Sequence, residues 1–279
     1  MSSGCGGILL GMDYATNPAD GSRIAYRSTG QGTPIVLLHG TALSQAIWRG
    51  FGYLSALGRT HRVITLDLRG HGRSDKPHAS TSYGIDLFVG DVIAVLDALD
   101  VPAAHVVGYS LGARVALAVA ASHPDRVISL SSVAGAPGTG LGVFDRVFFD
   151  GAIAALELGG MAGFLQAWER ASGHPVDSAT RMAFDANDAA ALAAYMREAE
   201  RLPRVTDAEL AALPMPVLLL AGTRDRERLT AMEHLRAQLP QAEWHVLDGA
   251  THADTPRHPQ TLPLLEAFVD RVDEGRAFA

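Results

Sequence analysis

The sequence predicts an α/β fold with a mostly parallel sheet, and two observations support this. Short apolar runs alternate with longer stretches in which apolar residues recur at helical spacing. The short runs are apolar on both faces, as parallel strands must be when helices cover both sides of a sheet. Strands that alternate with helices in this way imply right-handed crossovers between parallel neighbours.

Six short runs, rich in apolar and β-branched residues, are predicted to be buried strands. In chain order they cover residues 35–38, 63–66, 106–107, 127–130, 217–220 and 244–247. Three helices are predicted from the spacing of apolar residues, over 86–99, 111–122 and 259–272. Pro259 lies near the first turn of the last helix, where a missing backbone N–H costs nothing.

One region interrupts the alternation. Residues 136–210 are rich in Ala, Leu and Phe, and no run among them predicts a strand. Asn187 is expected to cap a helix that runs to about residue 202, and Thr206 and Glu209 have the spacing of a capping box. We therefore expect a core formed by 1–135 and 211–279, with a helical cap over 136–210. A separate interaction domain is the alternative interpretation of this insert.

Composition excludes several classes of protein. The 279 residues carry a formal net charge of −7, which argues against broad nucleic-acid binding. A single cysteine, Cys5, excludes an intrachain disulfide. No stretch reaches the roughly 20 apolar residues of a membrane span. Residues 1–11 lack the basic start and long apolar core of a signal peptide, so we expect a cytoplasmic protein, with Met12 as an alternative start to Met1.

The strongest chemical signal is Gly108-Tyr109-Ser110-Leu111-Gly112, a G-x-S-x-G motif between a predicted strand and a predicted helix. In that context the serine lies on a tight, strained turn, and the residues two before and two after it must be small. The following helix directs its positive end at the site. We therefore predict Ser110 as a nucleophile.

A serine hydroxyl needs a base, and the base needs an acid to orient it. His252 follows the last predicted strand, and Asp225 follows the strand before it. Both loops open at the carboxyl edge of the sheet, where active sites of such folds form. His252 is therefore the predicted base and Asp225 the predicted acid, in the chain order Ser, Asp, His.

Acyl transfer also needs two donors for the oxyanion of the tetrahedral intermediate. The backbone N–H of Leu111 is one predicted donor, because it directly follows the nucleophile. The other is expected from the loop after the first predicted strand, where Gly40 lets the backbone bend. Thr41 is the predicted second donor and Ala42 the alternative, while His39 is expected to brace this loop. We expect no metal ion and no organic cofactor in the reaction.

Together these motifs resemble the α/β-hydrolase superfamily, and the resemblance covers nearly the whole chain. It also includes the segment from Asp67 to Ser74, which reads Asp-Leu-Arg-Gly-His-Gly-Arg-Ser and is interpreted as a structural turn. The resemblance implies an eight-stranded, mostly parallel sheet and a helical cap at 136–210. Within the superfamily the chain is most similar to single-domain esterases, enol-lactonases and cofactor-free haloperoxidases. Haloalkane dehalogenases and many epoxide hydrolases carry Asp where Ser110 stands, which argues against both.

The predicted cap supplies the only indication of substrate. Its apolar side chains are expected mainly to pack the cap on the core, with a few facing the substrate. The predicted substrate contacts are Ala42, Tyr109, Phe144, Phe148 and Trp168. We expect a serine hydrolase acting on a small-to-medium apolar carboxylic ester or lactone. A carbon–carbon bond hydrolase, a perhydrolase and a non-catalytic ligand receptor on the same fold remain alternatives, and the sequence predicts no oligomeric state.

Overall fold

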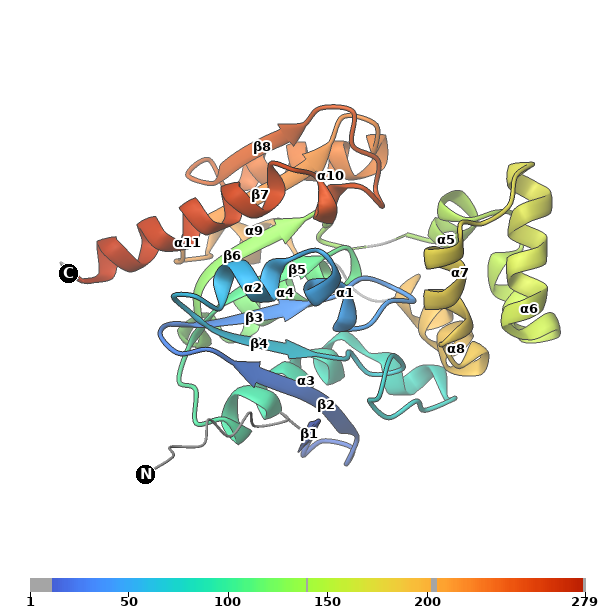
Figure 1. Ribbon diagram of the computed structural model, residues 1–279, viewed down its shortest axis with the longest axis horizontal. Helices are drawn as coiled ribbons and strands as arrows, with labels where there is room; N and C mark the ends of the chain where they lie inside the picture. Colours follow the sequence, from blue (N-terminus) through green and yellow to red (C-terminus); the bar gives the residue numbers. More distant parts are fainter. Residues whose placement is uncertain (1–11, 139, 202–204, 278–279) are drawn as a thin grey trace, which may run out of the picture.

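The computed structural model describes residues 12–138, 140–201 and 205–277, and its centre is an eight-stranded sheet (Figure 1). The strand order across the sheet is β1-β2-β4-β3-β5-β6-β7-β8. The strands are β1 (Asp13–Thr16), β2 (Arg23–Thr29), β3 (Pro34–Leu38), β4 (Arg62–Leu66), β5 (Ala104–Tyr109), β6 (Val127–Val133), β7 (Val217–Gly222) and β8 (Glu243–Leu247). From β4 to β8 every neighbouring pair is parallel, which confirms the predicted fold class.

The two strands at one edge of the sheet had no signal of their own in the sequence. β1 pairs antiparallel with β2, and β2 pairs antiparallel with β4. Only Ala15 is buried in β1, and the second half of β2 is partly exposed. An edge strand with so little buried surface lacks the continuous apolar run that marks the six central strands.

Helices cover both faces of the sheet, and side chains alternate between the two layers along each strand. Ile35 and Leu37 of β3 pack with one layer, and Val36 and Leu38 pack with the other. The first layer holds α1 (Ala46–Gly50), α2 (Tyr53–Leu57) and α11 (Thr261–Ala277). The second holds α3 (Ile85–Ala98), α4 (Leu111–Ser122) and α10 (Arg226–Gln238). Short 3₁₀ turns complete the core, η1 (Ser80–Tyr83), η2 (Pro124–Arg126) and η3 (Thr255–Arg257).

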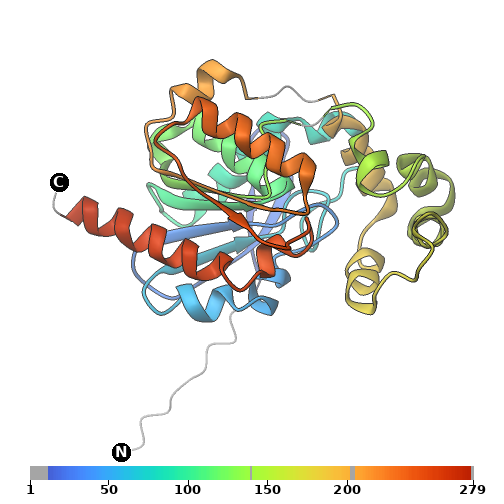
Figure 2. The same ribbon diagram turned by 90° about the horizontal axis from the view of Figure 1, so that it is seen from above.

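Five helices occupy the segment between β6 and β7. They are α5 (Val143–Val147), α6 (Ala152–Ser172), α7 (Ser178–Asp185), α8 (Ala189–Ala199) and α9 (Asp207–Ala211). Helices α5–α8 stand beyond the end of the sheet in both views (Figures 1 and 2). Helix α9 instead contacts α10 of the core. The part of the insert that stands away from the sheet is therefore α5–α8.

Of the two predicted helix caps, one is confirmed and the other was wrong. Thr206 and Glu209 form the predicted capping box at α9. The cap predicted at Asn187 was wrong, because Asp188 is the N-cap of α8 and its side chain accepts the Ala191 N–H at 2.9 Å. The Asn187 amide is used elsewhere, as described below. The predicted end of this helix near residue 202 falls at the edge of the described residues, and α8 itself ends at Ala199.

The turn after β4 is a buried polar junction. Arg69 is fully buried, and its guanidinium contacts both carboxylate oxygens of Asp91, at 2.7 and 2.6 Å. The same guanidinium reaches Asp20 at 2.9 Å and the Ser82 carbonyl at 2.7 Å. These contacts connect the turn to α3 and to the loop after β1, which agrees with the structural interpretation of the Asp67–Ser74 motif. Among the described residues, no helix is long and apolar enough to cross a membrane.

Candidate active site

Ser110 lies on the turn between β5 and α4, in a strained backbone conformation. Its φ of 54° and ψ of −110° lie outside the regions that residues other than glycine usually adopt. Its N–H donates to the Val133 carbonyl of β6 at 3.0 Å, and its own carbonyl accepts the Arg114 N–H of α4 at 3.1 Å. Hydrogen bonds on both sides therefore hold the strained residue in place.

The two glycines of the motif are needed because the backbones around Ser110 almost touch. A Cβ at Gly108 would lie 2.2 Å from the Gly112 carbonyl oxygen. A Cβ at Gly112 would lie 2.1 Å from the carbonyl oxygen of Leu38, at the end of β3. This explains the G-x-S-x-G spacing in physical terms, because any side chain at either position would push α4 away from the sheet.

The structure brings the three predicted triad residues together. The Nε2 atom of His252 lies 2.9 Å from Ser110 Oγ, and its Nδ1 atom lies 2.6 Å from Asp225 Oδ2. The other carboxylate oxygen of Asp225 accepts the Arg228 N–H at 3.4 Å, so Asp225 is also the N-cap of α10. The Asp225 side chain is 9% exposed and that of His252 is 30% exposed, so the carboxylate is shielded while the imidazole reaches solvent.

Tyr109 contacts His252 through both its hydroxyl and its ring. Its hydroxyl donates to the His252 carbonyl at 3.1 Å, and the two rings lie 5.5 Å apart. The tyrosine is 5% exposed, and burial raises its pKa above the ordinary value, so the hydroxyl remains a donor. These contacts place the Tyr109 side chain against His252, and the predicted contact of Tyr109 with a substrate stays a prediction.

The loop after β3 lies directly against Ser110. A Cβ at Gly40 would meet the Tyr109 ring at 2.9 Å and Ser110 Cβ at 3.4 Å. His39 is fully buried, and both ring nitrogens contact backbone: Nδ1–H donates to the Gly40 carbonyl at 2.8 Å, and Nε2 accepts the Leu68 N–H at 3.0 Å. His39 thus braces the loop, as predicted, and Thr41 and Leu111 lie on backbone segments that meet at Ser110.

Two residues of the insert hold this loop, and sequence reasoning missed both. The Tyr195 hydroxyl in α8 lies 3.2 Å from Thr41 Oγ1. The Asn187 amide donates to the Ala42 carbonyl at 2.9 Å. Ala42 is fully buried and has a φ of 60°, so the backbone here is strained as well as clamped. The sequence predicts Asn187 as a helix cap. Nothing in the neighbouring residues indicates that its amide contacts Ala42, 145 residues away.

The predicted substrate contacts of the insert lie in an aromatic cluster. Phe148 packs edge-on against Phe164, Trp168 and Phe184, with ring centroids 5.2–5.8 Å apart. Phe144 lies 5.9 Å from Tyr195, whose ring in turn packs against Phe88 of α3. The cluster is therefore continuous from the insert to the core. Contact of Phe144, Phe148, Trp168 and Ala42 with a substrate stays a prediction.

Two other histidines, His39 and His71, carry no charge near pH 7. Burial lowers the pKa of His39, and this effect outweighs the opposing influence of Asp67. Burial, and then the neighbouring His39, lower the pKa of His71 to about 3. Both rings are consequently neutral near pH 7 and fully buried. The Ser110 hydroxyl contacts His252 instead, at 2.9 Å.

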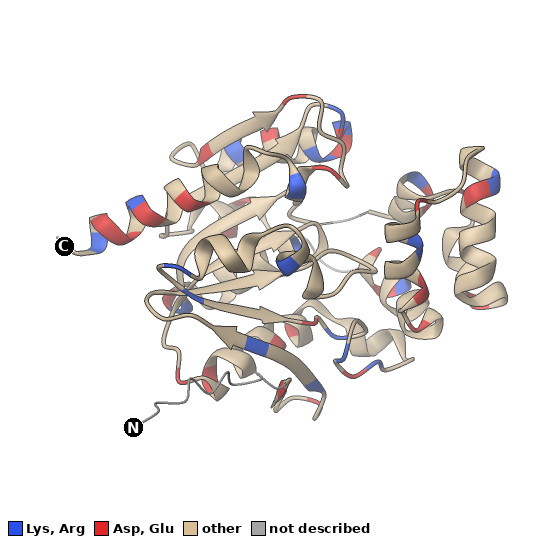
Figure 3. Ribbon diagram, viewed as in Figure 1, with Lys and Arg blue, Asp and Glu red and all other residues tan. Residues whose placement is uncertain are grey.

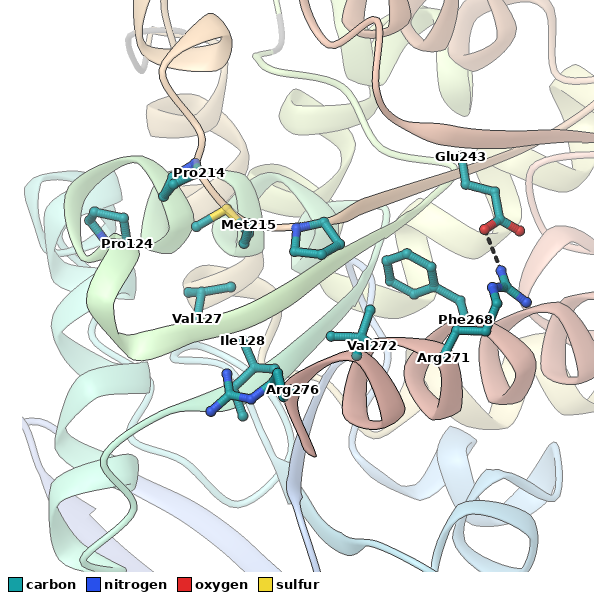
Figure 4. Close-up of a pocket in the computed structure, with 12 residues that line it drawn as sticks. Pro124, Val127, Ile128, Pro214, Met215, Glu243, Phe268, Arg271, Val272 and Arg276 are labelled. Carbon is teal, nitrogen blue, oxygen red and sulfur yellow. Dashed lines mark hydrogen bonds and ion pairs between the residues drawn. The ribbon is translucent and has the colours of Figure 1, made fainter. Parts of the chain in front are cut away.

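The structure also contains a groove of about 590 Å³ (Figure 4). It is lined by the residues that precede or begin β6, β7 and β8, including Val127, Pro216 and Glu243, and by one side of α11. These are the amino ends of the parallel strands, whereas Ser110, Asp225 and His252 follow the carboxyl ends. The groove therefore contributes nothing to the triad.

Comparison with known proteins agrees with the geometry. A family model described as the alpha/beta hydrolase fold matches residues 33–152. The candidate carbamate hydrolase RutD of Caulobacter segnis is 30% identical over 242 residues, which cover 83% of this chain and 89% of that protein. A solved N-acyl homoserine lactone degrading enzyme superposes with a TM-score of 0.72 at 28% identity, over 92% of this chain and 100% of the other.

Some relatives match over a shorter region. The 2-hydroxymuconate semialdehyde hydrolase of Pseudomonas sp. (strain CF600) is 36% identical over 110 residues, which are 39% of this chain and only 38% of that protein. This match is partial, whereas the match to the Caulobacter protein extends over most of both chains. The match to the Caulobacter protein, together with the eight-stranded sheet and the turn that carries Ser110, shows that the chain belongs to the α/β-hydrolase superfamily.

Proposed function

We propose that this chain is a serine hydrolase that cleaves a small-to-medium, apolar carboxylic ester or lactone. The observation that carries the proposal is the pair of contacts made by His252, at 2.9 Å to Ser110 Oγ and 2.6 Å to Asp225 Oδ2. Both lie within the range expected between a nucleophile, its base and the acid that orients the base.

The proposed reaction proceeds in two acyl-transfer steps. His252 Nε2 takes the proton of the Ser110 hydroxyl as Oγ attacks the substrate carbonyl, and Asp225 stabilises the resulting imidazolium. The backbone N–H groups of Leu111 and Thr41 are the proposed donors to the oxyanion, at the N-terminus of α4 and in the adjoining loop. His252 then protonates the leaving alcohol, and water hydrolyses the acyl-enzyme by the same route.

Two observations support the substrate class. The aromatic cluster of the insert lies beside the loop that holds Thr41, and rings of this kind suit an apolar acyl or alcohol group. In addition, the structural neighbour at 28% identity degrades an N-acyl homoserine lactone, which is a cyclic ester with an apolar chain.

The test is hydrolysis of p-nitrophenyl esters from acetate to decanoate, together with a panel of aliphatic lactones. The wild type is compared with Ser110→Ala and with Ser55→Ala, a control on the exposed side of α2. We expect multiple turnovers in the wild type and the control, and none in Ser110→Ala. A fluorophosphonate probe should label the wild type at Ser110, as read by peptide mass spectrometry.

The two readouts separate the possible outcomes. Labelling without turnover on any ester or lactone would redirect the proposal to a carbon–carbon bond substrate with the same triad. A folded wild type that is neither labelled nor active would refute the serine hydrolase and favour a ligand receptor on this fold.

A further inference from the structure

A second group of chemically capable side chains lies at the opposite end of the sheet from Ser110. His61 directly precedes β4, His105 is the second residue of β5, and Asp273 lies in α11. His61 and His105 are almost completely buried, and Asp273 is partly exposed. Residues from three elements, far apart in the sequence, thus meet where α11 crosses the amino ends of the strands (Figure 1).

Both histidines direct the same ring nitrogen at one carboxylate. His105 Nε2 lies 3.0 Å from Asp273 Oδ1, and His61 Nε2 lies 3.4 Å from Asp273 Oδ2. The donor atoms of the three residues all lie within 4.8 Å of one another. Donors about 2.0–2.1 Å from a tetrahedral Zn²⁺ are separated by roughly 3.3–3.4 Å. The two distances from a histidine nitrogen to the carboxylate are close to that value, and the 4.8 Å limit on all three donor atoms keeps them within reach of one ion.

The other nitrogen of each ring has a partner that suits metal binding. His105 Nδ1 lies 2.7 Å from Ser129 Oγ, and His61 Nδ1 lies 2.9 Å from Thr60 Oγ1. A hydroxyl can either donate or accept a hydrogen bond. Each ring can therefore carry its proton on Nδ1 and offer the Nε2 lone pair to a metal, without moving the hydroxyl. Such partners behind the ligands commonly fix the tautomer of metal-binding histidines.

A metal binds the neutral imidazole of a histidine and the ionised carboxylate of an aspartate. Arg276 is a charged neighbour of His105, and its positive charge opposes the binding of a cation.

A fourth donor is available on the same helix. Asp270 lies one turn before Asp273, and its Oδ1 atom is 3.9 Å from His61 Nε2. Its side chain is 58% exposed. Acidic residues recur along α11, with basic residues among them (Figure 3). We propose that His61, His105 and Asp273 form a Zn²⁺ site, completed by Asp270, that fastens α11 to β4 and β5. This site is separate from the proposed ester hydrolysis and is independent of it.

The test uses the full chain in a Cys5→Ser background, so that the free thiol cannot contribute. After treatment with a chelator and dialysis, Zn²⁺ binding is measured by competition with a chromogenic chelator, and the midpoint of thermal unfolding is recorded with and without Zn²⁺. We expect one tightly bound ion per chain and a higher unfolding midpoint. In Asp273→Asn the affinity should fall at least tenfold and the metal-dependent rise should disappear.

Two further variants keep the test decisive if Asp273→Asn folds poorly. Asp270→Asn changes an exposed side chain and should weaken binding several-fold in a folded protein. His234→Gln removes an exposed histidine paired with Asp207 at 2.8 Å and should leave binding unchanged, as a matched control. Co²⁺ in place of Zn²⁺ should give the visible absorption of a four-coordinate ion in the wild type and lose it in Asp273→Asn.

The alternative is a purely hydrogen-bonded junction between α11 and the sheet. In that case Asp273→Asn would lower the unfolding midpoint equally with and without Zn²⁺. That result, or a wild type that does not bind Zn²⁺, would overturn the proposal.

Discussion

Replacing Gly112 by Ala sets two physical effects against each other at the centre of the site. Gly112 is the second residue of α4, and alanine in a helix is intrinsically favoured over glycine by about 1 kcal/mol. The new Cβ, however, would lie 2.1 Å from the Leu38 carbonyl oxygen and 2.8 Å from that of His39, both in rigid backbone. Ordinary contact begins at 3.4 Å, so α4 and β3 must separate by about 1.3 Å.

That displacement is larger than the helix preference can offset. It moves the Leu111 N–H away from the loop that holds Thr41, and a misplacement of about 1 Å typically costs about 100-fold in rate. We expect kcat/KM to fall about 100-fold, or about 2.7 kcal/mol, in Gly112→Ala. Overpacking should also cost about 1–3 kcal/mol of stability and lower the midpoint of thermal unfolding.

The assay is kcat/KM on the best p-nitrophenyl ester, with thermal unfolding followed by circular dichroism. Gly163→Ala in α6 is the matched control, because its Cβ would meet only the Ala155 carbonyl oxygen, at 3.6 Å. It should keep full activity and gain up to about 1 kcal/mol. Unchanged activity together with a raised midpoint in Gly112→Ala would refute the steric argument.

Three further predictions follow from contacts in the core and the site. Asp225→Asn should lower kcat about 10⁴-fold in steady-state assays, because an amide donor at His252 Nδ1 forces the ring proton onto the nitrogen that faces the serine. Asp91→Ala leaves the buried Arg69 without its main partner, and urea unfolding should show a loss of about 3–5 kcal/mol; a loss under 1 kcal/mol would contradict this account. His71 has a pKa lowered to about 3, so below about pH 6.5 the unfolded state binds a proton that the folded state does not. Stability should therefore decline as pH falls, and His71→Asn should make that decline shallower by roughly 1.4 kcal/mol per pH unit in urea unfolding between pH 6 and 4; an unchanged slope would show that His71 is protonated in the folded protein.

The parts of the fold that sequence reasoning found are those with local signals. The central strands are continuous apolar runs, and the turn that carries Ser110 needs small residues at fixed spacing. A short stretch of sequence is therefore enough to predict either feature. The proximity of Asp225 and His252 to Ser110 could be predicted because parallel strands open their loops at one edge of the sheet.

The parts it missed depend on contacts between distant residues. Tyr195 and Asn187 contact partners 154 and 145 residues away, and Asp273 meets His105 across 168 residues. Helical periodicity shows which face of a helix is buried, but it does not show what that face meets. An exposed edge strand such as β1 is missed for a different reason, since its pairing is made by backbone atoms that carry no sequence signature.

The contacts that Tyr195 and Asn187 make with the loop after β3 connect two parts of the molecule whose sequences can evolve at different rates. Ser110, Asp225 and His252 all come from the core, and the insert reaches their surroundings through Tyr195 and Asn187. Substitutions elsewhere in α5–α8 can therefore reshape that side of the candidate site without moving these three residues. We expect selection for a new substrate to change residues of these helices. The Tyr195 hydroxyl and the Asn187 amide should remain, because they hold the loop after β3.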